Sequence, residues 1–185
     1  MIDKEKYVYN IDRFVKDFDF DLILQEAENS DYSNVFGPGS YDRLVSDSHE
    51  TASKWFDNHD WQVSVVQGGE ALRLAEKISS ILELDVSYLY PQFLKLYQGE
   101  ELRWHVDKVV KVSMNFVLKG FDTPVQFIDY PDPIYYDAAI LNTREMHCVP
   151  FAKNEDRILL KLRIPNPSDL YDYNGIVDKF KSIAK

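Results

Sequence analysis

The sequence holds one cysteine, Cys148, so no disulfide can form within the chain. Disulfides are common in secreted proteins and rare in the cytosol, where thiols stay reduced. No apolar run is long enough to span a bilayer, and the N-terminal segment lacks an apolar core of the length found in signal peptides. We therefore expect a cytoplasmic protein that has no membrane partner.

Basic residues are also scarce. Lys and Arg together number 21 against 31 Asp and Glu, which gives a formal net charge of −10. A surface of this sign repels phosphate backbones, so no nucleic acid is expected as a partner. Hydrophobic residues make up 45% of the 185 residues, which is enough for the core of an ordinary globular protein.

No internal repeat, low-complexity tract or linker rich in Ser and Gly divides the chain. Residues 1–185 are therefore predicted to form a single domain. Residues 1–85 mix helices and strands, which are expected to flank the rest of the fold. Hydrophobic spacing predicts helices over 20–28 and 69–84 and strands over 6–11 and 61–66.

Residues 86–164 have a different pattern, in which strand-length segments alternate with turn-forming residues. The longest segment, 109–118, alternates apolar and polar side chains, so one face of its sheet is expected to lie on a core. Short, evenly spaced strands predict a mainly β sandwich or jelly roll, and residues 165–185 are predicted to form a C-terminal helix. The expected strands are 93–97, 109–118, 125–130, 134–141, 145–151 and 157–164.

Two of the four histidines suggest a metal site. His105 and Asp107 are two residues apart, so their side chains point to the same side of an extended segment. His147 lies on another predicted strand and can complete the site from the facing wall. Two histidines and one carboxylate form the facial triad of non-haem Fe(II) oxygenases, in which three coordination positions stay open. The His-x-Asp pair alone is a weak signal in an acidic chain, where it also fits an ordinary surface histidine.

Arg157 strengthens this interpretation, because it begins the strand that follows His147. We expect a hairpin of strands 145–151 and 157–164, which would place the guanidinium beside the His147 strand and inside the barrel. A dicarboxylate that chelates iron through a 2-oxo acid group would present its far carboxylate there. An arginine paired with acidic residues on the hairpin surface is the alternative.

The period-two alternation of a strand makes a further prediction about residues 157–164. If Arg157 points into the barrel, then Leu159, Lys161 and Arg163 share its face, and the apolar residues between them pack on helices. A shifted register would make Arg163, and not Arg157, the carboxylate-binding residue.

The stretch from Tyr97 to Asp107, the segment 142–147 and Arg157 together resemble the Fe(II)/2-oxoglutarate-dependent dioxygenase superfamily. The pattern is similar both to its prolyl-hydroxylase-like branch and to its aspartyl/asparaginyl β-hydroxylase-like branch. The resemblance implies a double-stranded β-helix, which is a cupin-like jelly-roll core, over residues 86–164, with flanking helices.

The same resemblance implies the roles of individual residues. His105, Asp107 and His147 would be the catalytic residues that bind Fe(II), and Arg157 would bind the co-substrate 2-oxoglutarate. Tyr97 stands where many members carry a tyrosine ahead of the first metal-binding histidine, so it would donate a hydrogen bond to 2-oxoglutarate; a barrel-lining aromatic is the alternative. The implied reaction uses O₂, hydroxylates a substrate and releases succinate and CO₂.

Two departures from the family pattern leave the branch and the substrate open. Many members have Ser or Thr two residues after the arginine, where this chain has Leu159. The aspartyl-hydroxylase branch has a basic residue and a histidine at the positions of Lys111 and Ser113. We expect a small polar metabolite, such as a free amino acid, or a peptide residue as substrate, and the acidic chain favours a weakly basic or zwitterionic one.

Two other functions also fit a metal-binding barrel: a cupin-like domain without oxygenase turnover, and a metal-dependent isomerase or hydrolase. Neither requires an arginine beyond the distal histidine, so Arg157 favours the dioxygenase. Residues 36–41 form a glycine-bearing loop, which is either a lid over the barrel mouth or a plain connection. Cys148 follows His147 in its strand, so we expect its side chain on the opposite face, buried as a small apolar group.

Overall fold

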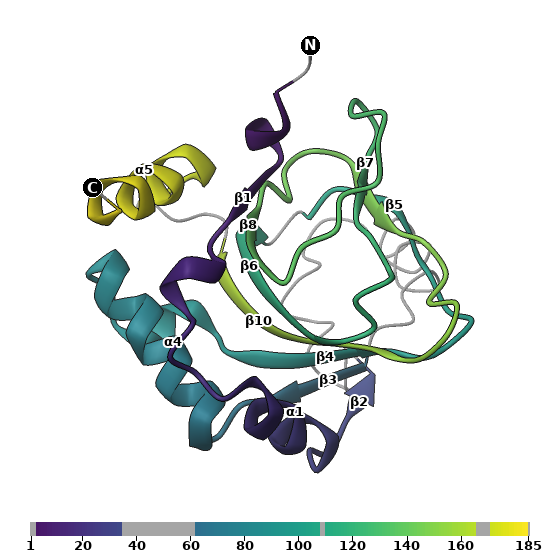
Figure 1. The fold of residues 1–185 in the computed structure, drawn as a ribbon, viewed down its shortest axis with the longest axis horizontal. Helices are drawn as coiled ribbons and strands as arrows, with labels where there is room; N and C mark the ends of the chain where they lie inside the picture. The colour runs from purple at the N-terminus through teal and green to yellow at the C-terminus, as the bar shows by residue number, and fades with distance from the viewer. Residues whose placement is uncertain (1–2, 35–61, 108–109, 166–170, 185) are drawn as a thin grey trace, which may run out of the picture.

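The computed structural model describes residues 3–34, 62–107, 110–165 and 171–184. The loop 36–41, with its predicted lid, lies outside these residues. Two antiparallel β-sheets face each other, and the α-helices of the described residues pack on the outer face of the larger sheet (Figure 1). The fold is therefore mainly β, with the jelly-roll core that the strand spacing predicts.

The larger sheet has seven strands and the smaller sheet has three. In spatial order, the larger sheet consists of β1 (Val8–Asn10), β8 (Ala138–Leu141), β6 (Val110–Lys119), β10 (Arg157–Pro165), β4 (Gln92–Leu96), β3 (Gln62–Val65) and β2 (Ser33–Asn34). The smaller sheet consists of β5 (Leu102–His105), β9 (His147–Val149) and β7 (Gln126–Phe127). The helices are α1 (Phe20–Glu28), α4 (Gly69–Leu82) and α5 (Tyr173–Ile183), with short 3-10 turns η1 (Lys4–Lys6), η2 (Asp12–Phe14) and η3 (Val86–Leu89).

Alternation along the strands divides the apolar residues between two cores. The even-numbered residues of 158–164 in β10 and of 112–118 in β6 face the helices and pack against them. The odd-numbered residues Val117 and Leu159 face the smaller sheet, where they pack with residues such as Leu102. Arg157, Lys161 and Arg163 are also odd-numbered, so the barrel side of this strand presents charged groups to the interior.

The expected hairpin of strands 145–151 and 157–164 is wrong. β9 lies in the smaller sheet between β5 and β7, whereas β10 lies in the larger sheet between β6 and β4. Arg157 therefore stands opposite Leu96 of β4 and is not beside His147 in a shared ladder.

The segment between β9 and β10 carries the chain from one sheet to the other. Pro150 directly follows β9 and has no N–H group with which to extend the ladder. The Gly99 N–H donates to the Ala152 carbonyl at 2.8 Å, and the Ala152 N–H donates to the Glu100 carbonyl at 3.1 Å. The connection between β9 and β10 thus pairs with the turn between β4 and β5. Local sequence spacing cannot distinguish such a connection from a hairpin turn.

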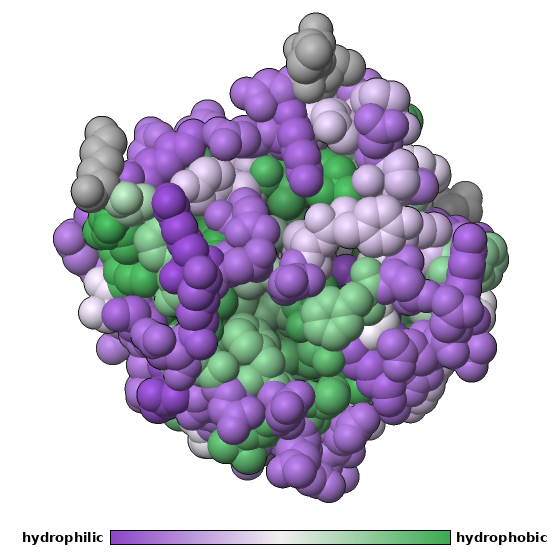
Figure 2. Space-filling model, viewed as in Figure 1, coloured by the Kyte–Doolittle hydropathy of each residue, from purple (hydrophilic) through white to green (hydrophobic). Residues whose placement is uncertain are grey.

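Polar side chains predominate on the face of the molecule shown in Figure 2. In Figure 2 hydrophilic residues cover most of the face shown, and apolar residues gather in patches between them. Within the ranges that the structure describes, none of the helices has the length and apolar character needed to cross a membrane. The apolar residues are concentrated in the two cores.

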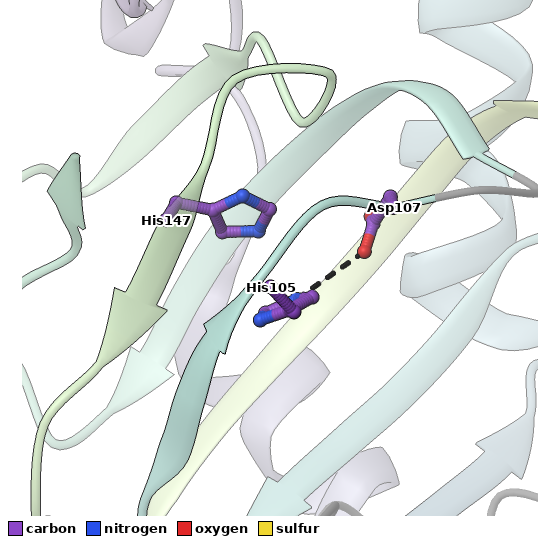
Figure 3. A group of neighbouring side chains, drawn as sticks. All are labelled: His105, Asp107 and His147. Carbon is purple, nitrogen blue, oxygen red and sulfur yellow. Dashed lines mark ion pairs between the residues drawn. The ribbon is translucent and has the colours of Figure 1, made fainter. Parts of the chain in front are cut away.

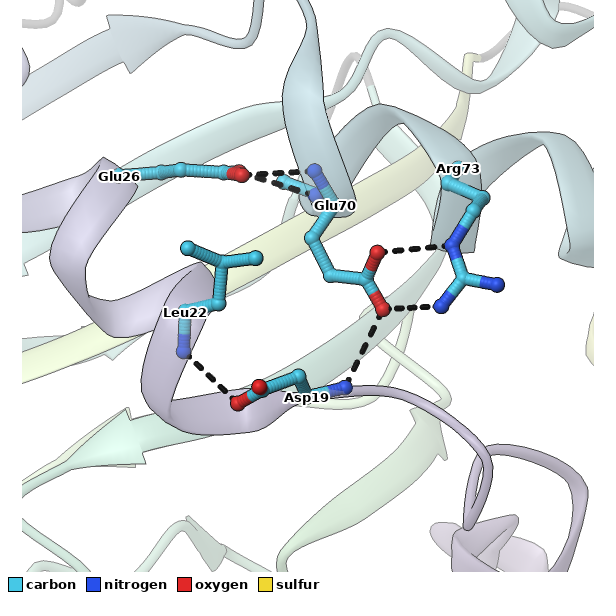
Figure 4. A network of polar contacts seen from close by, with 6 residues as sticks. Asp19, Leu22, Glu26, Glu70 and Arg73 are labelled. Carbon is cyan, nitrogen blue, oxygen red and sulfur yellow. Dashed lines mark hydrogen bonds and ion pairs between the residues drawn. The ribbon is translucent and has the colours of Figure 1, made fainter.

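A network of carboxylates joins α1 to α4 (Figure 4). Glu26 in α1 accepts hydrogen bonds from the Glu70 and Ala71 N–H groups at the start of α4, at 2.6 and 3.0 Å. Gly69 has a φ of 76°, and a Cβ atom there would collide with the Glu26 carboxylate. The first N–H groups of a helix have no partner within it. Glu26 therefore supplies the cap that Gly68, at the N-cap position of α4, has no side chain to provide.

Replacing Glu26 with Ala is expected to lower the free energy of unfolding by about 1–2 kcal/mol, because it removes a cap and a negative charge from the positive end of α4. Glu28→Ala is the matched control in the same helix. Its ion pair with Lys119 is exposed, so we expect a change below about 0.5 kcal/mol. Urea unfolding followed by circular dichroism measures both, and equal effects would show that Glu26 is not a cap.

Candidate metal centre

Two histidines lie opposite each other on neighbouring strands of the smaller sheet. His105 ends β5, His147 begins β9, and the two residues are paired across the antiparallel ladder. Their ring centroids are 4.3 Å apart. His147 thus reaches the site from the adjacent strand, and the expectation that it comes from the facing wall is wrong.

A backbone carbonyl two residues earlier orients each imidazole. His105 Nδ1 lies 2.7 Å from the Arg103 carbonyl oxygen, and His147 Nδ1 lies 2.9 Å from the Glu145 carbonyl oxygen. A carbonyl oxygen only accepts hydrogen bonds, so Nδ1 of each ring carries the proton. This leaves Nε2 of each ring as the atom that can bind a metal.

Asp107 completes the group (Figure 3). Its Oδ1 lies 3.3 Å from His105 Nε2, and the ligand atoms of the three residues lie within 4.8 Å of one another. Metal–ligand bonds of about 2.0–2.2 Å span roughly twice that length between two ligands. A small inward movement of the side chains would therefore bring all three onto one ion.

The electrostatics of the group suit a metal. Burial alone would raise the pKa of Asp107, but the Lys161 ammonium and the two imidazoles outweigh it, and the pKa lies well below its usual range. Oδ2 of Asp107 is buried, lies 3.7 Å from Lys161 Nζ and accepts no hydrogen bond. Burial also lowers the pKa of His147 to about 4, so this imidazole is neutral at pH 7. Metal ligands must be deprotonated, and both of these groups are.

The three side chains line a cavity of about 130 Å³ between the two sheets. The aliphatic part of its wall consists of Val63, Leu94, Leu102, Val110, Val125, Leu141, Val149 and Leu159. The other polar residues that line it are Gln92, Ser113, Asn115, Tyr136, Thr143, Arg157, Lys161 and Arg163. A largely apolar pocket with a few converging polar groups is typical of a ligand site.

Arg157 is buried in this cavity, with 1% of its surface exposed. Its Nη1 donates to the Gly120 carbonyl at 3.4 Å and its Nη2 to the Tyr136 hydroxyl at 3.3 Å, while Nε has no acceptor. No carboxylate of the described residues lies within ion-pair distance, and Asp156 pairs instead with Lys95 at 3.1 Å. A buried cation without a counter-ion is costly. A ligand with an anionic group could therefore supply the counter-ion that Arg157 lacks among the described residues.

Tyr136 is a cavity residue that the sequence analysis missed. Its hydroxyl accepts hydrogen bonds from Asn115 Nδ2 at 3.2 Å and from Arg157 Nη2 at 3.3 Å. With both lone pairs used, its own hydrogen is available to donate to a ligand. Tyr136 falls in the expected strand 134–141, of which only Ala138–Leu141 forms β8, so it lies in the connection between β7 and β8. Ser113 and Asn115 are polar residues on the barrel face of β6, and in the sequence they were the available indication that a polar partner lies in the cavity.

Tyr97 is not among the residues that line the cavity, which corrects its expected role. Leu94 and Leu96 face the barrel, so Tyr97 lies on the opposite face of the strand with Lys95, whose Nζ is 4.8 Å from its ring centroid. Tyr97 is 40% exposed. Cys148 is buried as expected, with its Sγ 3.6 Å from Gln126 Oε1, and burial raises the pKa of its thiol to about 11.

The barrel face of β10 follows the expected alternation. Arg157, Leu159, Lys161 and Arg163 all line the cavity, while the residues between them pack under the helices. Both arginines thus face the interior. Only Arg157 combines full burial with an unused donor, which favours it over Arg163 as the residue for a ligand carboxylate near the metal group.

Comparisons with known proteins bear on the fold. No protein-family model matches the sequence, and no curated protein is detectably similar to it. A viral collagen prolyl hydroxylase from Paramecium Bursaria Chlorella virus-1 superposes with a TM-score of 0.52 and 13% identity, over 88% of this chain and 90% of that one. A 2OG-Fe(II) oxygenase family protein from Burkholderia pseudomallei gives a TM-score of 0.44 and 12% identity, over 76% of each chain. An RmlC-like cupin from Shewanella frigidimarina gives 0.41 and 10%, over 78% of this chain and 91% of that one. The chain therefore shares the fold of the viral prolyl hydroxylase, in agreement with the jelly roll described above.

Proposed function

We propose that the protein is an Fe(II)- and 2-oxoglutarate-dependent dioxygenase that hydroxylates a small molecule or a peptide residue. The observation that supports this most is Arg157, a buried guanidinium that has no counter-ion among the described residues and lines the same cavity as His105, Asp107 and His147. A cupin-like domain that only binds a metal would use the three ligands but would have no need of this cation.

The ligand set suits a divalent first-row metal that keeps open coordination positions. Fe(II) bound here would activate O₂ and, with electrons from the oxidative decarboxylation of 2-oxoglutarate, oxidise a substrate C–H bond. The chain's own residues hold the ligands ready for it. The Arg103 and Glu145 carbonyls fix both imidazoles, and Lys161 keeps Asp107 ionised.

Arg157 and Tyr136 would hold the far carboxylate of 2-oxoglutarate. Arg157 offers its unused Nε–H and a full positive charge, and Tyr136 offers its hydroxyl hydrogen. Tyr136 would thereby supply the hydroxyl that Leu159 lacks. The aliphatic walls exclude water around this pair, which strengthens charge-assisted hydrogen bonds.

Tyr136→Phe is expected to weaken 2-oxoglutarate binding roughly two- to tenfold, because it removes one hydrogen bond to the carboxylate. Tyr135→Phe is the matched control: this neighbouring tyrosine is 56% exposed and does not line the cavity. Calorimetric titration of 2-oxoglutarate measures both variants. Equal affinity in Tyr136→Phe and the wild type would remove Tyr136 from the co-substrate site.

Titration of 2-oxoglutarate under argon into Fe(II)-loaded protein tests the proposal without knowledge of the substrate. Chelation of Fe(II) by a 2-oxo acid produces a visible charge-transfer absorption, which succinate cannot produce because it lacks the 2-oxo group. We expect saturable absorption with 2-oxoglutarate and none with succinate. Absence of 2-oxoglutarate binding by both absorbance and calorimetry would contradict the proposed function.

A further inference from the structure

Three cations line the cavity along β10. Arg157, Lys161 and Arg163 face its interior, while Asp107 is the one carboxylate among the lining residues that the structure describes. The cavity is therefore positive although the whole chain carries a net charge of −10. A substrate inside it responds to this local field more than to the distant surface charges, which solvent screens.

The row of cations has a closed end and an open end. Arg157 is 1% exposed, the Lys161 side chain is 18% exposed, and Arg163 is half-buried. A strand rises about 3.3 Å per residue, so Arg163 lies roughly 20 Å from Arg157 along β10. Lys161, which contacts Asp107, lies between them. Arg157 thus marks the closed end of the row and Arg163 its more exposed, open end, and the contact of Lys161 with Asp107 lies between them along the strand.

The three cations differ in their partners. Lys161 Nζ lies 3.7 Å from Asp107 Oδ2, and the proposed function uses Arg157 for the co-substrate. Arg163 has no acidic partner within ion-pair distance in the part of the chain that is described; burial lowers its pKa, and the nearby Tyr90 and Asp107 oppose this shift. Its Cζ lies 5.4 Å from the ring centroid of Tyr90, a residue with a φ of 45°, which non-glycine residues adopt mainly at constrained sites.

We propose that the substrate carries a carboxylate and that Arg163 binds it at the open end of the cavity; this inference rests on the proposed dioxygenase function. A planar guanidinium offers two parallel N–H groups to a carboxylate, and a cation–π contact such as that with Tyr90 uses none of these N–H groups. A substrate entering from the open end would meet Arg163 first and extend toward His105, Asp107 and His147. The carboxylates of substrate and co-substrate would then lie at opposite ends of the cavity, where their repulsion is small.

Matched acids and amides test this inference by binding alone. The probes are butanoate with butanamide and 3-phenylpropanoate with 3-phenylpropanamide, titrated calorimetrically under argon into the full chain with Fe(II) and saturating 2-oxoglutarate. In the wild type we expect at least one acid to bind about tenfold more tightly than its amide, as a hydrogen-bonded charge pair predicts. In Arg163→Gln the acid and amide should bind within about twofold of each other.

Two further variants separate a binding role from a folding role. Arg163→Lys keeps the charge and should keep part of the acid preference, and Arg13→Gln, an exposed arginine outside the cavity, should keep all of it. Affinity for 2-oxoglutarate alone should stay unchanged in Arg163→Gln, which would show that the variant folds and that its co-substrate site at Arg157 is intact. The inference is overturned if neither acid is preferred in the wild type, or if the preference survives in Arg163→Gln. Failure of 2-oxoglutarate to bind the wild type would instead overturn the proposed function.

Discussion

Arg157→Met is expected to weaken 2-oxoglutarate binding by about 2–5 kcal/mol, the loss seen when one partner of a buried charge pair is removed. Fe(II) affinity should stay within about threefold of the wild-type value, which corresponds to about 0.7 kcal/mol, because Arg157 is not a proposed metal ligand. The guanidinium is fully buried, and the carboxylate of the co-substrate is the counter-ion that its surroundings lack. Separate calorimetric titrations of Fe(II) and of 2-oxoglutarate under argon measure the two affinities.

The same variant distinguishes a ligand-binding arginine from a structural one. Because Arg157 is buried without an ion pair among the described residues, Met should leave the free energy of unfolding of the ligand-free protein unchanged or raise it by about 1 kcal/mol. Arg13→Met, at an exposed position, is the control. A loss of stability above about 2 kcal/mol would assign Arg157 a structural role. Loss of 2-oxoglutarate binding in Arg163→Met, with binding kept in Arg157→Met, would move the assignment to Arg163.

His105→Ala and His147→Ala are each expected to lower Fe(II) affinity by about a hundredfold or more. Removing a residue that only hydrogen-bonds to a metal ligand already lowers metal affinity by about 10–100-fold, and these variants remove a ligand itself. Two remaining ligands hold a labile divalent ion poorly. Cys148→Ala is the matched control, since this residue adjoins His147 but directs its side chain to Gln126. Metal titration by calorimetry measures all three. Wild-type affinity in both histidine variants would exclude the triad as the iron site.

Local patterns account for much of the fold. The helix predicted over 20–28 is α1, because its hydrophobic spacing and its Asp19 cap are both contained in a short stretch. The alternation over 157–164 places Arg157 and Arg163 on the barrel face, because the parity of a strand depends only on its own residues. The same parity places His105 and Asp107 on one side. Their role in metal binding stays a prediction.

Features that depend on how distant segments meet were not predictable in this way. Backbone hydrogen bonds of Ala152 help to direct the chain from β9 to the larger sheet, where β10 lies. The hairpin with the His147 strand was therefore a reasonable but wrong prediction. Tyr97 was misplaced because a difference of one residue in a strand reverses the face of a side chain. Tyr136 lies within the expected strand 134–141, but only tertiary contacts bring its hydroxyl to Arg157.

The central claim is that Fe(II) and 2-oxoglutarate react in the cavity that contains His105, Asp107, His147 and Arg157. Its most direct test is the formation of succinate from 2-oxoglutarate by the full chain, with Fe(II) and O₂, in the presence and absence of the two carboxylic acid probes. We expect succinate and CO₂ in equal amounts, in a reaction that depends on Fe(II) and O₂ and is lost in Asp107→Ala and Arg157→Met. A wild-type protein that binds Fe(II) tightly and forms no succinate above the Asp107→Ala variant under any of these conditions would contradict it.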